Sequence, residues 1–433
     1  MSYVPVRELQ RKLYRAAKAD GDRRFHSLRD KLYRADVLER AWELVKRNQG
    51  TYGVDRQSIA AIEQAGVERF LAGIARELRE GTYRATPVRR VHIPKRGRPQ
   101  KSRPLSIPTV KDRVVQQATR LVIEPLFEAD FLPSSFGFRP RRSARDASLA
   151  IYGWLNAGCV HVVDADIADC FGQIDPERLI GLVSRRVADG YVLALIRAWL
   201  RAGVMEGDRV FRNQFGVPQG GPISPLLSNV YLHELDRAWA ERGYERRGGF
   251  DAKLIRYADD LVIVSSKPVA ERLRTLLAEE LGALGLSLSE EKTRVTTAAE
   301  GFSFLGFRFK RSHSRKHGRE VTHFFPTPEA TKRARERVRR VLALGQARGE
   351  SLAETIEQLN YGLRGWAAYY AHCHAFRALD KLGAYANRRL RRHLRRRRQS
   401  SGLGRYREMP DRVLYEELGL AYIRRGRVRY VTP

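Results

Sequence analysis

Apolar side chains recur at helical spacing along the first part of the chain. Between residues 5 and 48 they lie three or four positions apart, and this pattern predicts two helical segments in an N-terminal extension over residues 1–50. Gly50 and Gly53 close the extension. The same spacing predicts another helix over residues 58–79.

Residues 84–103 break the helical pattern. They contain eight basic side chains, three prolines and no acidic residue. Because proline disrupts a helix interior, two short strands near residues 87–93 and 103–107, joined by a basic loop, are favoured. Helical spacing returns over residues 110–128 and 176–202.

Two apolar stretches carry carboxylates. The strand predicted over residues 158–167 ends at Asp166, and residues 250–265 form two apolar arms around Asp259 and Asp260. An unpaired buried carboxylate is costly, so these groups require a cation or solvent. In the simpler interpretation, the Asp-Asp pair is the turn of a hairpin. If Asp166 joins it, the three would suit two Mg²⁺ ions, although the sequence does not show whether they meet.

The end of the chain has a different character. From about residue 327 it is predicted to be helical and basic, with Thr327 before a proline as an N-cap and Ser351 with Glu354 as a capping box. Strands and helices followed by this helical part predict an α+β body with a helical appendage.

Charge narrows the class of partner. Lys and Arg number 81 against 49 Asp and Glu, a net charge of +32, which favours nucleic acid or an acidic membrane surface. No apolar run is long enough to span a bilayer, and the three cysteines imply no disulfide framework, so a soluble, cytoplasmic protein is expected. Adjacent residues on a helix point apart, so His372-Cys373-His374 is not expected to bind zinc.

Five segments between residues 48 and 309 form an ordered set of motifs. The segments are Ser135–Pro140, Val163–Ile167, Gly216–Leu226, Arg256–Asp260 and Phe304–Phe307. In this order they resemble the motifs of group II intron-encoded reverse transcriptases. The resemblance implies a right-hand polymerase with fingers, a palm with an antiparallel sheet, and an α-helical thumb.

The same resemblance divides the chain. It implies fingers and palm over residues 51–325, a thumb or maturase domain over 326–400 and a basic C-terminal segment over 401–433. The last segment looks like the ending of relatives that lack an endonuclease domain, because the His and Cys pairs of an HNH nuclease are absent.

The resemblance also implies the chemistry. Asp166 and Asp259 would be the main ligands of two Mg²⁺ ions, with Mn²⁺ as a substitute, and Asp260 would support them. Ile167 is included among the metal and nucleotide positions. A primer 3′-hydroxyl, on DNA or RNA, would attack the α-phosphate of a deoxynucleoside triphosphate opposite an RNA template.

Five further side chains are implied to bind the nucleotide. Phe171, five residues beyond Asp166, would exclude a ribose 2′-hydroxyl; the alternative is an ordinary core phenylalanine. For Lys95 and Arg103 the alternative is a solvated basic loop. For Lys292 it is an exposed Glu–Lys pair on a helix. The implied nucleotide-binding residues are Lys95, Arg103, Ile167, Phe171, Gln219 and Lys292.

The chain departs from the family pattern beside this pocket. Many relatives have Phe-Phe-Asp where this chain has Cys170-Phe171-Gly172, and an Asn-His pair where Asp175-Pro176 stands. The implied metal ligands are retained, but the sequence does not show how the residues beside the nucleotide pocket pack.

Residues 359–370 resemble the maturase-specific thumb segment, which implies binding of the parent group II intron RNA. Trp366, Tyr369 and Tyr370 share one helix face, and at least one ring is expected only to pack. Eight arginines lie within residues 388–398, a charge density that suits RNA phosphates. The implied RNA-binding residues are Arg364, Trp366, Tyr369, Arg388, Arg389, Arg392, Arg395 and Arg396.

Two alternatives stay open. One is a free-standing reverse transcriptase in DNA repair or phage defence, which the genes flanking the reading frame would distinguish. The other is a non-catalytic RNA-binding splicing factor, against which the retained carboxylates argue.

Overall fold

The computed structural model describes residues 4–95, 98–206, 209–211, 216–315, 318–397 and 409–423. The chain forms two compact units, which are described separately. Unit 1 comprises Met1–Ser143, Ala165–Ile263 and Glu271–Arg294, and unit 2 comprises Ala144–Asp164, Val264–Ala270 and Val295–Pro433.

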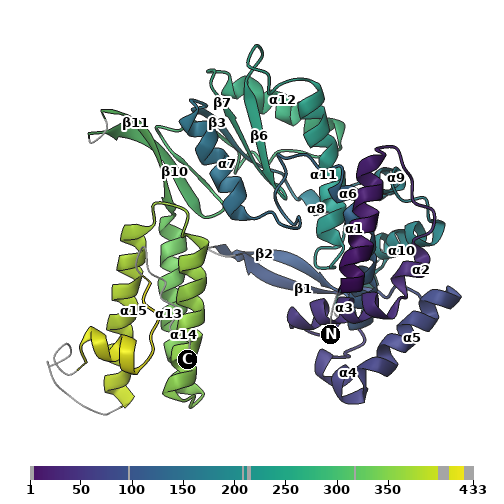
Figure 1. The fold of residues 1–433 in the computed structure, drawn as a ribbon, viewed down its shortest axis with the longest axis horizontal. Coiled ribbons are helices and arrows are strands. Elements are labelled where there is room, and N and C mark those ends of the chain that lie inside the picture. The colour runs from purple at the N-terminus through teal and green to yellow at the C-terminus, as the bar shows by residue number, and fades with distance from the viewer. Residues whose placement is uncertain are drawn as a thin grey trace. The chain divides into compact units, whose positions relative to one another are not determined.

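Unit 1 is built around one long buried helix, α6 (Val110–Glu128), whose bounds agree with the predicted helix over 110–128. Helices α1 (Val4–Ala19) and α3 (Ala35–Arg47) pack against it, with the short α2 (Arg29–Leu32) between them in sequence (Figure 1). The predicted helical character of this region is confirmed, although the structure adds the short α2 to the two helices expected.

Two predicted helices are interrupted. The helix expected over 58–79 is α4 (Ile59–Ala65) followed by α5 (Val67–Glu80), because Gly66 lies between them with φ of 102°. The helix expected over 176–202 is α9 (Pro176–Ser184) followed by α10 (Gly190–Arg201). The side chain of Asp189 caps α10 by accepting hydrogen bonds from the backbone N–H groups of Tyr191 and Val192, so a new helix begins there.

The first sheet of unit 1 has the strand order β2-β1-β4-β5. Strands β1 (Val88–Lys95) and β2 (Arg98–Ile107) pair antiparallel, which confirms the predicted strands and lengthens both. Strand β4 (Val204–Glu206) runs parallel to β1 and pairs with β5 (Arg209–Phe211). These two short strands were not predicted from the sequence.

A second four-stranded sheet has the order β6-β7-β3-β8. Its strands β6 and β7 are the two arms predicted within residues 250–265, and Asp166 ends β3 as predicted. In the sequence, α8 follows β3, α11 precedes β6 and α12 follows β7. The bounds are β3 His161–Asp166, β6 Ala252–Tyr257, β7 Asp260–Ser265, β8 Arg294–Thr297, α8 Cys170–Gln173, α11 Ser224–Glu241 and α12 Ala270–Ala283.

Unit 2 contains an antiparallel sheet of order β11-β10-β9, against which helix α7 (Ala144–Asn156) packs. Its core is aromatic, since the rings of Phe309 and Phe324 stack with centroids 5.4 Å apart. The strands are β9 Phe302–Phe304, β10 Phe307–Ser314 and β11 Arg319–Pro326.

Three helices complete unit 2, and α13 packs against the other two (Figure 1). Both predicted caps are confirmed: Thr327 accepts a hydrogen bond from the backbone N–H of Ala330, and both hydrogen bonds of the Ser351 capping box are present. The helices are α13 Pro328–Ala347, α14 Leu352–Tyr369 and α15 Phe376–Arg397. Within the predicted basic segment 401–433, only residues 409–423 are described.

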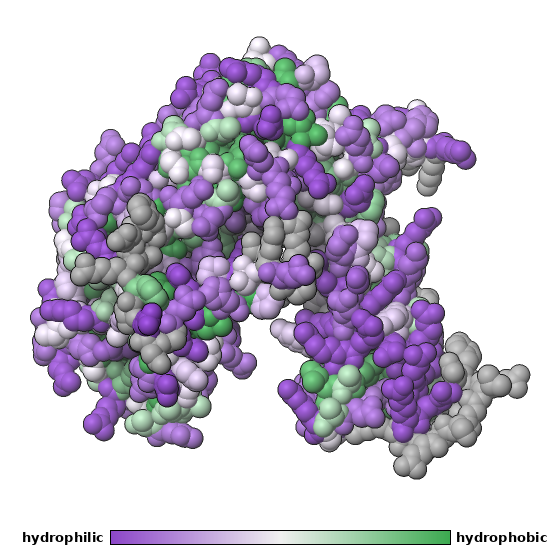
Figure 2. Space-filling model, turned by 180° about the vertical axis from the view of Figure 1, so that it is seen from behind, coloured by the Kyte–Doolittle hydropathy of each residue, from purple (hydrophilic) through white to green (hydrophobic). Residues whose placement is uncertain are grey.

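Hydrophilic residues dominate the molecular face seen in Figure 2, in keeping with the net charge of +32. Among the described helices, none combines the length and the apolar character needed to cross a membrane. The four-part division of the chain stays a prediction.

Candidate active site

The turn between β6 and β7 presents two carboxylates. Ala258 adopts a left-handed conformation with φ of 58°, and Asp259 and Asp260 follow it, both half-buried. Gly137 lies against this turn so closely that a Cβ built there would overlap the backbone nitrogen of Ala258. A glycine at residue 137 is therefore required for the close approach.

Asp166, Asp259 and Asp260 lie within electrostatic reach of one another in unit 1. Burial raises the pKa of Asp259, and the negative charge of Asp166 raises it further. Burial raises the pKa of Asp260 to about 6, with added contributions from the charges of Asp259 and Asp166. The cations of Arg103 and Lys292 act in the opposite direction on the pKa values of Asp259 and Asp260. The turn and the end of β3 thus contribute to one charged group.

Lys292 pairs directly with Asp166, with its Nζ 2.6 Å from Oδ2. The turn that carries Lys292 is fixed to the end of β3, because the backbone N–H of Ser289 donates to the Asp166 carbonyl at 2.7 Å. Residue 292 lies in a turn and not in a helix, so the alternative of an exposed Glu–Lys pair on a helix is wrong.

The donor chemistry of this group suits a divalent cation. Carboxylate oxygens are the ligands that Mg²⁺ prefers, and repulsion among three carboxylates is relieved by a bound cation. In the described residues, no three His, Cys, Asp or Glu side chains are already arranged to hold a metal ion. Asp166 is paired with Lys292 instead. The three carboxylates fit Mg²⁺ because they are oxygen ligands and carry negative charge.

A glycine-rich loop joins the elements expected to bind the nucleotide. The backbone N–H of Val217 donates to the carbonyl of Phe171, and that of Ser106 in β2 donates to the carbonyl of Gln219, each at 2.7 Å. Gly220 has φ of 129°, and a Cβ there would overlap the carbonyl oxygen of Ser106. The loop therefore fixes Gln219 to β2 on one side and to Phe171 on the other.

The remaining predicted nucleotide residues lie around this loop. Phe171 is half-buried and is not part of the fully buried core, and Arg103 is exposed on β2 opposite Ile93. Ile167 is buried and forms an antiparallel bridge with Leu288. Lys95 ends β1, but its side chain lies outside the described residues.

The departures from the family pattern have a local explanation. A Cβ built at Gly172 would overlap the Asp169 carboxylate, so Asp169 occupies the space that a side chain at residue 172 would need. Asp175 is the N-cap of α9, since its Oδ1 accepts a hydrogen bond from the Arg178 N–H at 2.7 Å, and Pro176 begins the helix.

The aromatic residues at the end of α14 pack within unit 2. Tyr369 stacks on Phe307 with ring centroids 5.3 Å apart, and its hydroxyl donates to the Leu305 carbonyl at 2.9 Å. Tyr370 is buried, and Trp366 lies against it at a centroid distance of 4.6 Å. The expectation that at least one ring only packs is met by Tyr370, although it packs against the β9–β10 turn as well as a helix.

Most of the arginines predicted to bind RNA lie on α15. Arg388, Arg392 and Arg396 are exposed at intervals of four residues, so they lie along one helix face, and Arg389 and Arg395 are half-buried. Arg364 is exposed on α14. Arg398 lies outside the described residues.

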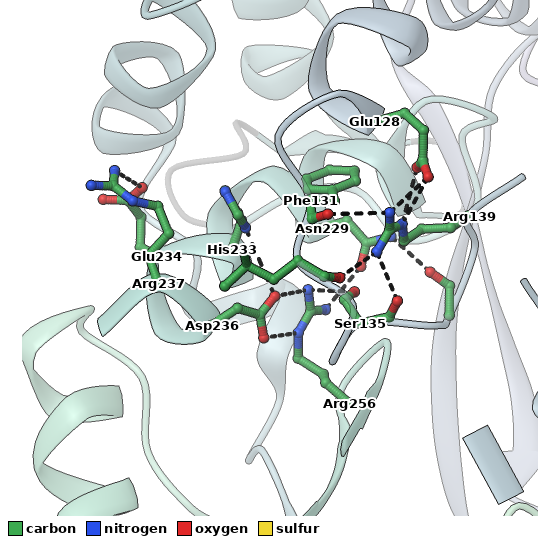
Figure 3. Close-up of polar contacts among 12 residues, drawn as sticks. Glu128, Phe131, Ser135, Arg139, Asn229, His233, Glu234, Asp236, Arg237 and Arg256 are labelled. Atoms are coloured by element: carbon green, nitrogen blue, oxygen red, sulfur yellow. Dashed lines mark hydrogen bonds and ion pairs between the residues drawn. The ribbon is translucent and has the colours of Figure 1, made fainter. Parts of the chain in front are cut away.

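Sequence reasoning missed the residue that supports the Ala258–Asp260 turn from inside. The guanidinium of Arg256 is completely buried and lies between Asp236, Asn229 and Ser135 (Figure 3). The signal in the sequence is a single arginine between the apolar residues of β6 and the Asp-Asp turn. A charged residue at such a position indicates a buried partner.

Comparison with known proteins identifies two matching regions. Residues 93–309 match the family described as reverse transcriptase (RNA-dependent DNA polymerase), and residues 331–411 match the group II intron, maturase-specific domain.

Several curated proteins are similar over most of the chain. Protein YkfC of Escherichia coli is 32% identical over 359 residues, which cover 75% of this chain and 93% of YkfC. Group II intron-encoded protein LtrA of Lactococcus lactis is 30% identical over 302 residues, covering 68% of this chain and 48% of LtrA. A putative COX1/OXI3 intron 2 protein of Saccharomyces cerevisiae is 26% identical over 296 residues, covering 56% of this chain and 34% of that protein. The chain thus spans about half the length of LtrA.

Proposed function

The chain belongs to the reverse transcriptase family and carries a group II intron maturase-specific domain, and from this premise we propose which residues perform DNA synthesis and which RNA the protein binds. The proposed reaction is attack of a primer 3′-hydroxyl on the α-phosphate of a deoxynucleoside triphosphate, directed by an RNA template. Pyrophosphate leaves.

Asp166 and Asp259 are the proposed ligands of two Mg²⁺ ions, with Asp260 in support. Ile167 is proposed as a further ligand through its main chain, since isoleucine has no side-chain ligand atom. Bound Mg²⁺ would stabilise the attacking and leaving oxygens of phosphoryl transfer. The pKa values of Asp259 and Asp260 support this assignment, because burial raises them and the negative charges of neighbouring carboxylates raise them further.

The nucleotide would lie between β2 and the Gly216–Gly221 loop. Arg103, together with Lys95 and Lys292, would neutralise the triphosphate. Phe171 would close the space that a 2′-hydroxyl needs, and Gln219 would line the pocket. The two backbone hydrogen bonds that connect the loop to Phe171 and to β2 support one shared pocket.

In the proposed right-hand architecture, β1 and β2 belong to the fingers and the β6-β7-β3-β8 sheet to the palm. Helices α13, α14 and α15 form the thumb. The N-terminal helices over residues 1–50 form the proposed extension, which packs on α6.

The proposed RNA partner is a group II intron, whose splicing the protein would promote in the cytoplasm. The match of residues 331–411 to the maturase-specific domain supports this partner over a free-standing role. The exposed arginines of α14 and α15 would hold phosphates, so binding would weaken steeply as salt rises. Splicing of the cognate intron, with and without the protein, tests this part of the proposal.

The observation that carries the polymerase assignment is the electrostatic group of Asp166, Asp259 and Asp260. The experiment extends a DNA primer on an RNA template with Mg²⁺, with Mn²⁺ and with neither. Asp259→Ala should abolish extension and leave duplex binding intact, whereas Asp36→Ala, on the N-terminal helix α3, should extend as wild type does. Extension by Asp259→Ala near the wild-type rate would overturn the assignment.

A further inference from the structure

Arg256 lies three residues before Asp259, and each of its five N–H groups has an acceptor. Nε and Nη2 donate to the two carboxylate oxygens of Asp236 at 2.8 and 2.6 Å. Nη2 also donates to Ser135 Oγ at 2.8 Å. Nη1 donates to Asn229 Oδ1 at 2.9 Å and to the carbonyl oxygen of Ala258 at 3.2 Å. The guanidinium therefore has no donor left over.

The acceptors come from three separate segments of unit 1, and Figure 3 shows three of them, Asp236, Asn229 and Ser135, around Arg256. Asp236 and Asn229 lie on α11, Ser135 lies beside the turn, and each is almost completely buried. Asn229 also donates to the carbonyl of Gly137 at 2.8 Å, and Gly137 lies against Ala258. The cluster thus ties α11 and the 134–138 segment to the turn that carries the catalytic carboxylates.

Stability alone is a weak explanation for this cluster. Removing an ion pair from water is expensive, and apolar side chains of similar volume often stabilise a core as well or better. The guanidinium also fixes the geometry of its partners, because its planar group holds five hydrogen bonds in one arrangement. One of those bonds reaches the Ala258 carbonyl, which belongs to the peptide that leads into Asp259. Ala258 holds φ of 58°, a conformation that needs support in any residue other than glycine.

We propose that Arg256 is a positioning residue, which fixes the Ala258–Asp259 peptide and thereby orients the Asp259 carboxylate for the polymerase reaction. This role rests on the proposed function of Asp259 as a metal ligand. Outer-shell partners of this kind typically change metal affinity or activity about 10- to 100-fold when they are replaced.

The test compares two equivalent substitutions. Arg256→Lys keeps the charge but offers three donors in place of five. Arg186→Lys is the matched control, because Arg186 is also buried, pairs with Asp130, and donates its remaining N–H groups to the carbonyls of Ala17, Asp20 and Arg23, away from the turn. For each variant we would measure the melting temperature, binding of a primer–template duplex, kcat and KM for the deoxynucleotide, and Mn²⁺ binding by electron paramagnetic resonance.

Both variants should lose thermal stability, but only Arg256→Lys should affect the metal. It should weaken Mn²⁺ binding and lower kcat by about 10-fold or more, while the duplex affinity and the KM change little. If Arg256→Lys alters Mn²⁺ binding and kcat no more than Arg186→Lys does, the positioning role is refuted.

A smaller change covers the case in which Arg256→Lys does not fold. Ser135→Ala removes one acceptor and should weaken Mn²⁺ binding and lower kcat in the same direction by a smaller factor; wild-type values for both would overturn the proposal.

The wild-type enzyme distinguishes a failure of the proposed function from a failure of the proposed role of Arg256. If it fails to extend a primer, the proposed function falls, and if it extends while the variants match their controls, only the role of Arg256 falls.

Discussion

Lys292 donates a hydrogen bond from Nζ to Oδ2 of Asp166 at 2.6 Å, although the two residues are 126 positions apart in the sequence. The lysine also lowers the pKa values of Asp259 and Asp260, and so opposes the effect of burial and of the neighbouring carboxylates. One exposed ammonium group therefore helps to keep the proposed metal ligands ionised.

The first prediction concerns the pH dependence of DNA synthesis. Asp260 has a pKa of about 6, and a carboxylate binds a cation only when it is deprotonated, so the rate at low Mg²⁺ should rise as the pH increases through about 6. Lys292→Gln removes a charge that lowers this pKa, and the midpoint of the pH–rate profile should move upward. Lys12→Gln, on the exposed face of α1, removes the same charge elsewhere and should leave the midpoint in place. An unchanged midpoint in Lys292→Gln would contradict the coupling.

The second prediction concerns the choice of sugar. Phe171 is half-buried, and its carbonyl, not its ring, accepts the hydrogen bond from Val217. Phe171→Ala should therefore leave the loop in place and admit ribonucleotides, with about a 10-fold or greater fall in the ratio of deoxy- to ribonucleotide kcat/KM. Phe171→Tyr keeps the ring and should keep the preference. If Phe171→Ala discriminates as strongly as wild type does, the ring is not the gate.

Much of the fold follows from local patterns. Helical spacing predicts α6, apolar arms on both sides of an Asp-Asp pair predict the β6–β7 hairpin, and the caps at Thr327 and Ser351 mark where helices begin. These features depend on neighbours in the sequence, so the sequence is sufficient to predict them. The breaks at Gly66 and before Asp189 were missed because apolar spacing continues across them.

The support of the site depends on distant residues. The side-chain partners of the Arg256 guanidinium, Asp236, Asn229 and Ser135, lie 20, 27 and 121 positions away, and no local pattern connects them. The contact of Lys292 with Asp166 was missed for the same reason. The carboxylates themselves were found because two of them are adjacent and the motifs around them resemble a known family.

The third prediction tests the loop that connects β2 to Phe171. Gly220→Ala places a Cβ against the Ser106 carbonyl at a residue with φ of 129°, so it should displace Gln219, raise the KM for the deoxynucleotide and destabilise the fold by more than about 1 kcal/mol. Gly282→Ala is the control, since that glycine lies in α12 with nothing close to it, and it should stabilise the helix by about 0.5–1 kcal/mol. Thermal unfolding and nucleotide titration measure both effects. A wild-type KM in Gly220→Ala would contradict the assignment of this loop to the nucleotide pocket.

The fourth prediction concerns stability against pH. Burial lowers the pKa of His233 from its ordinary value of 6.5. The unfolded chain then binds this proton more readily than the folded chain, so the stability that His233 contributes is fully present above pH 6.5 and is lost as the pH falls below it. His233→Phe keeps a ring against Phe131, whose centroid lies 5.4 Å from that of His233, and removes the titrating group. Denaturant unfolding at pH 7.5 and pH 5.5 should therefore show a smaller loss of stability in the variant, and an equal loss would contradict the assignment.

The fifth prediction concerns the arginines of α15. Arg388 and Arg392 are exposed one helical turn apart, and each would neutralise about one phosphate if the face binds RNA. Replacing both with alanine should weaken binding to structured RNA and reduce the slope of log K against log salt by up to about 1.4 to 1.8, because fewer counterions are released. Arg272→Ala with Arg274→Ala, on the exposed face of α12, removes the same charge and serves as the control. If the two double variants change the slope equally, the effect reflects the net charge of the protein and not a binding face on α15. A change confined to the α15 variant would instead locate the phosphate contacts on that helix.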